Sequence, residues 1–306
     1  MEMSETRPLV LAWWNTSLSP LGKPRKTPAD SSYVLNFVRE LVRTLGVDIL
    51  ALGEVCSQDV SDIIRAIGDP RLSFHDATLM DGERRFDTAI LFDRRRLSLD
   101  ASVSVLDSYG KSTLKVGEKV RLLSFETGEY LHLFVSHWPS RLYCSETSPR
   151  RTEIGTSLRK ALDDIRSGAT SRQFIVLMGD YNDDPCSPSL ANHLLATRDR
   201  DLARENDKFL YNPFWRRLGE AVPFVVGQTL QSICGTCYYA GGETSRWFTF
   251  DQMMFSSAFL RDGPFVLNEE HSMIVRSDDL ESRIRSSGEV LDHLPVAGII
   301  DIRRKA

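Results

Sequence analysis

The chain has 306 residues, of which 42% are hydrophobic and 26% are charged. This length and composition allow a sizeable core, so we exclude a disordered chain and expect one globular domain over residues 1–306. Its 38 basic and 42 acidic side chains give a formal charge of −4, which argues against a protein held to nucleic acid mainly by a basic surface. A nuclease remains compatible with this charge, because a bound divalent cation and a local basic rim can offset the carboxylates.

The first residues do not resemble a targeting segment. Residues 1–7 are polar, and the apolar run 9–14 is short and lacks the small-residue cleavage site of a signal peptide. No run approaches the ~20 apolar residues that span a bilayer. The five cysteines are an odd number, unlike the disulfide frameworks of small secreted domains. We therefore expect a cytoplasmic protein with no membrane partner.

In chain order, the apolar pattern predicts two strand–helix units, then several strands, a third helix and late strands. The first helix has six apolar residues at helical spacing, with Asp30 or Ser31 available as its N-cap. The expected helices cover residues 31–45, 58–67 and 150–165. The expected strands cover residues 8–15, 48–52, 74–79, 86–92, 97–105, 119–125, 130–135, 174–178, 245–256 and 289–300.

Two features of these strands predict how they are arranged. Five consecutive apolar residues at 174–178 leave no solvent face, so that strand is expected to be buried on both sides. The polar turn at 126–129 predicts a hairpin between the strands on either side of it. Because the strands outnumber the helices and fall into two clusters, we expect an α/β fold of two sheets packed face to face, with helices outside.

Polar side chains stand at one end of five of the apolar runs. They are Asn15, Glu54, His137, Asp180 with Asn182, and Asp292 with His293. An apolar run places its ends at the rim of a buried sheet, so these groups can meet in one cleft although they are far apart in sequence.

Asp180 and Asn182 offer the chemistry of phosphate-ester hydrolysis at the end of strand 174–178. A carboxylate there can orient or deprotonate water, and an amide can bond a phosphoryl oxygen. Taken alone, this segment is more typical of an Asp/Asn turn. Magnesium prefers one or two carboxylates, with water and substrate phosphate completing its shell, so Glu54 and Asp292 with Asn15 would suffice. For Glu54 alone, helix capping is an equal alternative.

His293 and Asp251 form a candidate imidazole–carboxylate pair. An imidazole at this strand end can act as a general base or stabilise developing charge, while a carboxylate fixes its tautomer. Asp251 carries the one charge within the apolar and aromatic run 247–255, and an ionised group in such surroundings needs a partner. A solvent-facing aspartate on an edge strand is the alternative.

These residues resemble the endonuclease/exonuclease/phosphatase superfamily, which includes DNase I-like nucleases and exonuclease III-like repair enzymes. The resemblance extends over residues 8–300 and rests on six segments in the family order. They are Asn15 and residues 53–55, 136–141, 179–182, 250–252 and 292–296.

The resemblance implies a DNase I-like four-layer α/β/β/α sandwich with two packed, mainly antiparallel mixed sheets. It also implies cleavage of phosphate esters that depends on Mg²⁺ or Mn²⁺. The roles it implies are metal binding by Asn15, Glu54 and Asp292, water activation by Asp180, phosphoryl binding by Asn182 and His137, and completion of the site by His293, oriented by Asp251. The chemistry of the residues agrees, because phosphoryl transfer depends on positioning and charge neutralisation.

The segment from His137 to Arg141 is more similar to bacterial nuclease-like members than to inositol phosphatases, whose Asp-Asn motif usually continues with an arginine that residues 179–185 lack. We expect Arg141 and Arg151 to line a phosphate backbone and Trp138, beside His137, to contact substrate. A solvated surface for the arginines and a core position for the tryptophan are the alternatives.

We therefore expect a metal-dependent nuclease that cleaves DNA by attack of an activated water on phosphate. A phosphatase or phosphodiesterase for a small-molecule or lipid phosphate is the first alternative, and the mildly acidic charge favours it. A catalytically silent module that binds a partner through the cleft is the second. No motif residue is missing, which argues against a silent module.

Overall fold

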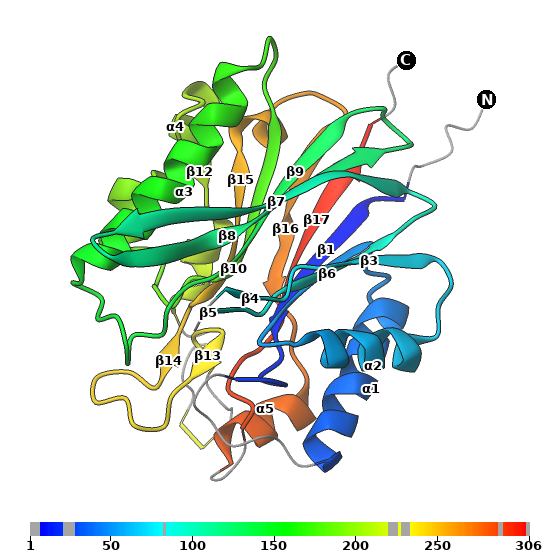
Figure 1. Cartoon of the computed structure of the whole chain (residues 1–306), viewed down its shortest axis with the longest axis vertical. Coiled ribbons are helices and arrows are strands. Elements are labelled where there is room, and N and C mark those ends of the chain that lie inside the picture. Colours follow the sequence, from blue (N-terminus) through cyan, green and yellow to red (C-terminus); the bar gives the residue numbers. More distant parts are fainter. Residues whose placement is uncertain are drawn as a thin grey trace.

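The computed structural model describes residues 7–20, 28–81, 84–219, 226–227, 233–286 and 290–303. Two mixed sheets form its centre (Figure 1). The first sheet has the order β16 (Phe265–Ile274), β17 (Val296–Ile302), β1 (Leu9–Asn15), β2 (Ile49–Gly53), β6 (Ala89–Asp93) and β3 (Leu72–Asp76). The second has the order β11 (Ala196–Thr197), β12 (Leu210–Tyr211), β15 (Asp251–Ser256), β10 (Phe174–Asp180), β9 (Tyr130–His137), β8 (Ser112–Ser124) and β7 (Leu97–Tyr109).

Helices cover the outer faces of the two sheets. The longer helices are α1 (Pro28–Thr44), α2 (Ser57–Ile67) and α3 (Pro149–Ser167), and the shorter ones are α4 (Arg200–Glu205) and α5 (Asp278–Arg285). In Figure 1, α1 and α2 lie on the side of the first sheet, and α3 lies on the side of the second. Two small hairpins join β4 (Leu79–Asp81) to β5 (Arg84–Phe86) and β13 (Cys237–Tyr238) to β14 (Trp247–Phe248). The expected four-layer α/β/β/α architecture is confirmed.

Alternation of side chains along the strands divides the core into three layers. In β1, Leu11 and Trp13 point between the sheets, whereas Ala12 and Trp14 point towards α1 and α2. This is the period of two that a strand imposes on its side chains. A third cluster lies between the second sheet and α3 and includes Leu158.

The strands expected from the sequence occur, but several differ in extent. The expected strand 74–79 is not continuous, because β3 ends at Asp76 and β4 begins at Leu79. The expected strand 86–92 is divided, because β5 ends at Phe86 and β6 begins at Ala89. The predicted hairpin at 126–129 is confirmed by antiparallel β8 and β9, although β8 begins earlier, at Ser112. The expected strand 245–256 is divided into β14 and β15.

The last expected strand, 289–300, begins later than predicted, and its first residue lies outside the described residues. β17 starts at Val296, directly after Pro295, which has no N–H for a strand ladder. The preceding residues, Asp292 and His293, are therefore outside the regular ladder and can be directed towards the other sheet. Within the part of the chain that the structure describes, no helix is both long and apolar enough to cross a bilayer.

Candidate active site

Strand ends from both sheets converge at one end of the sandwich. In the second sheet, Asp180 at the end of β10 is in register with His137 on parallel β9 and with Asp251 on antiparallel β15. In the first sheet, Asn15 at the end of β1 is in register with Gly53, so that Glu54 follows at the same edge. The sequence-based expectation that these groups gather at one rim agrees with this register.

Asp180 lies at the centre of the group and is 1% exposed. Its Oδ1 accepts a hydrogen bond from the backbone N–H of Asn182 at 2.8 Å, and its Oδ2 accepts one from Asn15 Nδ2 at 3.2 Å. The second of these bonds joins the two sheets. Two imidazole nitrogens also approach Oδ2, His137 Nε2 at 3.8 Å and His293 Nε2 at 3.7 Å. The carboxylate is thus held in one orientation between two histidines.

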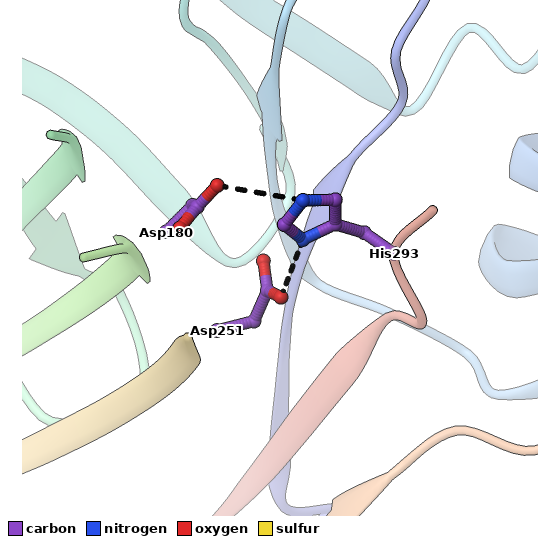
Figure 2. Close-up of side chains that lie close together, drawn as sticks. All are labelled: Asp180, Asp251 and His293. Carbon is purple, nitrogen blue, oxygen red and sulfur yellow. Dashed lines mark hydrogen bonds and ion pairs between the residues drawn. The ribbon is translucent and has the colours of Figure 1, made fainter. Parts of the chain in front are cut away.

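His293 is oriented by Asp251 through a bond of 2.7 Å between Nδ1 and Oδ2 (Figure 2). Asp251 is fully buried, and its other oxygen accepts a hydrogen bond from Trp13 Nε1 at 2.7 Å. Trp14 Nε1 donates to the backbone oxygen of His293 at 3.0 Å. Burial lowers the pKa of His293, but the Asp251 carboxylate outweighs this and holds the pKa well above its usual value. The Asp251 carboxylate thus favours the protonated form of His293.

His137 has an equivalent partner in Asp87, which the sequence analysis did not select. Its Nδ1 lies 2.9 Å from Asp87 Oδ2, and Lys115 forms an ion pair with the other oxygen of Asp87. Burial lowers the pKa of His137, but Asp87 outweighs it and raises the pKa to about 8. Burial likewise opposes ionisation of Asp87, yet His137 and Lys115 hold its pKa well below the usual range.

Two aspartate–histidine pairs therefore face a single carboxylate from opposite directions. In each pair the aspartate occupies Nδ1, which leaves Nε2 to face Asp180. An imidazolium in this position donates its Nε2 proton, so both histidines can contact an oxyanion placed near Asp180. Such an arrangement can stabilise the negative charge that develops on a phosphoryl group under attack by water.

Two of the candidate metal ligands, Asn15 and Asp292, are linked through Ser17. Its backbone N–H donates to Asn15 Oδ1 at 3.1 Å, and its hydroxyl donates to Asp292 Oδ1 at 3.1 Å. Ser17 has a φ of 46° and Glu54 a φ of 53°, in the left-handed region that non-glycine residues rarely adopt. Backbone strain of this kind is concentrated at functional sites.

These donors fit a hard divalent cation. Two carboxylates and one amide are oxygen ligands of the kind that Mg²⁺ and Mn²⁺ accept. A second group, Asp180, Asp251 and His293, has ligand atoms within 4.8 Å of one another. In that group Asp251 and His293 already bond each other at 2.7 Å. In the set of Asn15, Glu54 and Asp292, the oxygens Asn15 Oδ1 and Asp292 Oδ1 accept hydrogen bonds from Ser17.

The segment Cys234–Tyr238 supports the His293 side of the site and was not expected to do so. The Thr236 hydroxyl accepts a hydrogen bond from the Asp251 N–H at 2.9 Å. Cys237 is buried and forms a β-bridge with His293. The backbone N–H of Tyr238 donates to the backbone oxygen of Asp292 at 2.8 Å. These bonds hold the His293 segment, which lies outside any long strand, against β15.

The structure corrects the expectation that Arg151 contacts a phosphate backbone. Its side chain is buried, and its guanidinium donates to the backbone oxygens of Tyr181 at 3.1 Å, Pro139 at 2.8 Å and Cys144 at 2.6 Å. It also lies 3.5 Å from Asp183. In this position Arg151 fastens the loop after β9 to the loop after β10 and has no access to substrate.

Trp138 is likewise an interior residue, which corrects the expectation of a contact with substrate. It is 1% exposed, its Nε1 donates to the Val116 oxygen at 3.2 Å, and its ring packs edge-on against Tyr181. Its backbone oxygen accepts a hydrogen bond from Asn182 Nδ2 at 3.0 Å. Trp138 therefore positions the amide of Asn182 beside Asp180.

Arg141 lies at the edge of the site, but its guanidinium is turned towards the protein. Its Nε donates to the Asn182 oxygen at 3.0 Å, and its Nη2 lies 3.3 Å from Asp184. The guanidinium also stacks over Phe250 at 4.7 Å. The structure thus gives Arg141 a contact with the loop that follows β10, whereas binding of substrate by Arg141 stays a prediction.

Comparison with known proteins identifies related families and folds. A model of the Endonuclease/Exonuclease/phosphatase family matches residues 35–283. The human nocturnin catalytic domain with bound sulfate superposes with a TM-score of 0.61 at 16% identity, over 98% of this chain and 96% of that chain. No curated protein matches the chain by sequence.

Two further solved structures share the fold. TDP2 from D. rerio, in complex with a single-strand DNA product, has a TM-score of 0.57 at 17% identity, over 96% of this chain and 99% of that chain. A mannosyl-6-phosphatase from Bacteroides thetaiotaomicron has a TM-score of 0.58 at 13% identity, over 95% of this chain and 99% of that chain. At these identities the likeness concerns the fold.

Proposed function

Since the chain belongs to the endonuclease/exonuclease/phosphatase family, whose members hydrolyse phosphate esters, we propose that it is a metal-dependent nuclease that cleaves DNA. One observation carries the proposal. His137 Nε2 and His293 Nε2 lie 3.8 and 3.7 Å from the same oxygen of Asp180, and each histidine is held by its own buried aspartate. This arrangement suits the attack of water on a phosphodiester.

Asp180 is proposed to orient the attacking water and to accept its proton. Hydrogen bonds from Asn15 Nδ2 and the Asn182 N–H fix the carboxylate, so that it need not reorient as the reaction proceeds. Asn15, Glu54 and Asp292 would hold the divalent cation, which neutralises charge on the phosphate when it is bound.

His293 is proposed to stabilise the pentacovalent transition state and not to act as the initial base. The pKa of His293, which is raised by Asp251 despite burial, supports this choice, because a raised pKa favours the protonated form, which donates a proton and does not accept one. His137, with a pKa of about 8 despite its burial, is proposed to bind a phosphoryl oxygen from the other side. Asn182, held by the Trp138 oxygen, would contribute an amide to the same oxygens.

A phosphatase or phosphodiesterase for a small phosphate ester is the second candidate. It is favoured by the positions of Arg151 and Trp138, which are buried and so do not provide the expected contacts to a polymer. The formal charge of −4 points the same way. The DNA complex of D. rerio TDP2 and the mannosyl-6-phosphatase share the fold of this chain, so this fold is found with both kinds of substrate.

The two candidates are separated by assaying one preparation on polymers and on small esters. Purified protein with Mg²⁺ or Mn²⁺ would be incubated with supercoiled plasmid, linear duplex, single-stranded DNA and RNA, and in parallel with bis(p-nitrophenyl) phosphate and p-nitrophenyl phosphate. Cleavage of DNA that stops with EDTA and in Asp180→Asn supports the nuclease. The matched control is Asp62→Asn, an aspartate on α2 that pairs with Arg65 at the surface. Hydrolysis of a small ester with every polymer intact would reject the nuclease.

A further inference from the structure

A cavity of ≈ 630 Å³ lies at the far end of the second sheet from the candidate active site. It is formed by Gln173 and Phe174 at the start of β10, Ser256 at the end of β15, the last turn of α3 and the segment that precedes β16. Since β10 runs from Phe174 to Asp180, the cavity is separated from the catalytic carboxylate by ~20 Å, at ~3.3 Å per residue. Any ligand here would be distinct from the substrate under attack.

Positive charge exceeds negative charge around this cavity. Arg166, Arg172 and Arg261 line it, together with the carboxylates of Asp207 and Asp262. The side chain of Asp262 is fully exposed and forms an ion pair with Arg303 at 2.8 Å, so it is directed to solvent. Among the residues that line the cavity, three guanidinium groups therefore face one carboxylate, that of Asp207.

Asp207 is already occupied by other donors. Both of its oxygens accept from Arg172 Nε, at 2.9 and 3.0 Å, and one also accepts from the Ser257 hydroxyl at 2.6 Å. It is therefore committed to Arg172 and Ser257. The hydrogen bonds to Asp207 thus come from Arg172 and Ser257, and not from Arg166 or Arg261.

Arg166 Nη1 lies 3.4 Å from Asp163 Oδ1, a distance at the limit of a hydrogen bond. Asp163 is engaged by Arg159 through two shorter contacts, of 3.0 and 2.6 Å. Burial and the neighbouring Arg159 lower the pKa of Arg166, which agrees with a guanidinium that lacks a sufficient counter-charge.

Two buried donors at the cavity lack an acceptor among the described residues. They are Arg166 Nη2 and Arg261 Nε. Buried guanidinium N–H groups normally have partners, because leaving them unsatisfied costs free energy. Arg261 Nη2 also donates to the backbone oxygen of Arg204. Because the two unpaired atoms are closed to solvent, an oxyanion in the cavity would bind the remaining accessible N–H groups of the two guanidiniums, and arginine is well suited to bind phosphate.

We propose that this cavity is a second ligand site that binds a phosphorylated small molecule of nucleotide size. Its phosphate would lie between Arg166 and Arg261. The volume falls within the range of ~300–1,000 Å³ that is usual for small-molecule sites and exceeds what a free phosphate would fill. Phe174 and Pro264 give the cavity an apolar wall for the rest of such a ligand.

The site is tested by calorimetric titration of the full-length protein in EDTA with adenosine 5′-monophosphate, adenosine and inorganic phosphate. Arg166→Gln and Arg261→Gln should each weaken binding of the monophosphate at least ~10-fold. The matched control is Arg65→Gln, an exposed arginine on α2, which should bind as the wild type does. Adenosine should bind more weakly than the monophosphate.

A second comparison separates this site from the catalytic one. His293→Ala should retain wild-type affinity for the monophosphate, and Arg261→Gln should retain wild-type turnover of whichever polymer or small ester is cleaved best in the substrate comparison. The proposal is overturned if the monophosphate does not bind, if it binds both arginine variants as tightly as the wild type, or if His293→Ala abolishes binding. Binding of inorganic phosphate as tightly as the monophosphate would overturn the nucleotide-sized ligand. Circular dichroism of each variant verifies folding, and Arg166→Lys should restore part of the affinity because it keeps the charge.

Discussion

The Asp87→Asn variant tests whether this carboxylate sets the charge of His137. Asparagine keeps a side-chain oxygen for the contact with His137 Nδ1, which is 2.9 Å long, but removes the negative charge. Burial lowers the pKa of His137, and Asp87 raises it to about 8 against that effect. With the charge removed, burial and the nearby Lys115 would act unopposed by Asp87. We therefore expect the pKa of His137 to fall to its ordinary value of ~6.5 or below.

The same shift predicts a pH-dependent part of the stability. A pKa of about 8 in the folded protein, against ~6.5 in the unfolded chain, corresponds to about 2 kcal/mol at 1.36 kcal/mol per unit. Because the folded pKa is the higher of the two, this contribution is complete below pH ~6.5 and is lost as the pH rises through about 8. The imidazole is 14% exposed, so solvent screens the pair only in part.

The assay combines an NMR pH titration of the His137 ring with urea unfolding at pH 6 and pH 9, in EDTA. The difference in unfolding free energy between the two pH values should be about 2 kcal/mol smaller in Asp87→Asn than in the wild type. Lys115→Met is a control of opposite sign, because the ammonium group lowers the pKa of His137 and its removal should raise it. A His137 pKa near 8 in Asp87→Asn would refute the reasoning.

Three further substitutions have defined outcomes. His293→Ala should lower turnover at least ~10²-fold with unchanged circular dichroism, and near-native turnover would remove His293 from the mechanism. Glu54→Gln should raise the Mg²⁺ or Mn²⁺ concentration needed for half-maximal activity, and an unchanged metal dependence would place the cation elsewhere. Arg151→Ala should reduce the free energy of unfolding, measured in urea, by ~3–5 kcal/mol. The reason is that three buried backbone oxygens and Asp183 lose their contact with the guanidinium. An unfolding free energy within ~0.5 kcal/mol of the wild-type value would contradict this structural role.

The strands and their polar ends could be predicted from the sequence, because buried strands appear as apolar runs and the candidate site residues appear as polar residues at the ends of those runs. The run of apolar residues before Asp180 required a strand buried on both faces, and strand pairing then placed His137 and Asp251 in register with it. Asp251 could be assigned to His293 because a lone charge in an apolar run needs a partner. Asp87 lies in a similar setting, but in one uninterrupted strand over residues 86–92 it would not stand at a strand end; the structure places it between β5 and β6.

The roles of Trp138, Arg141 and Arg151 could not be predicted, because residue type does not show in which direction a donor points. Arginine binds carbonyl oxygens inside a protein as well as it binds phosphate outside. All three residues lie in or next to loops that fold back on the end of β10, where Arg151 bonds the Tyr181 oxygen and Arg141 the Asn182 oxygen. Such contacts depend on tertiary structure, which local sequence does not determine.

The most direct test of the central claim is the turnover of Asp180→Asn relative to wild type, measured with Mg²⁺ or Mn²⁺ on the best phosphate ester found in the substrate comparison. If Asp180 is the carboxylate that orients water between the two imidazoles, this variant should be at least ~10²-fold slower while remaining folded. The Asp62→Asn control should match the wild type. Near-native turnover of folded Asp180→Asn would contradict an active site built around this residue.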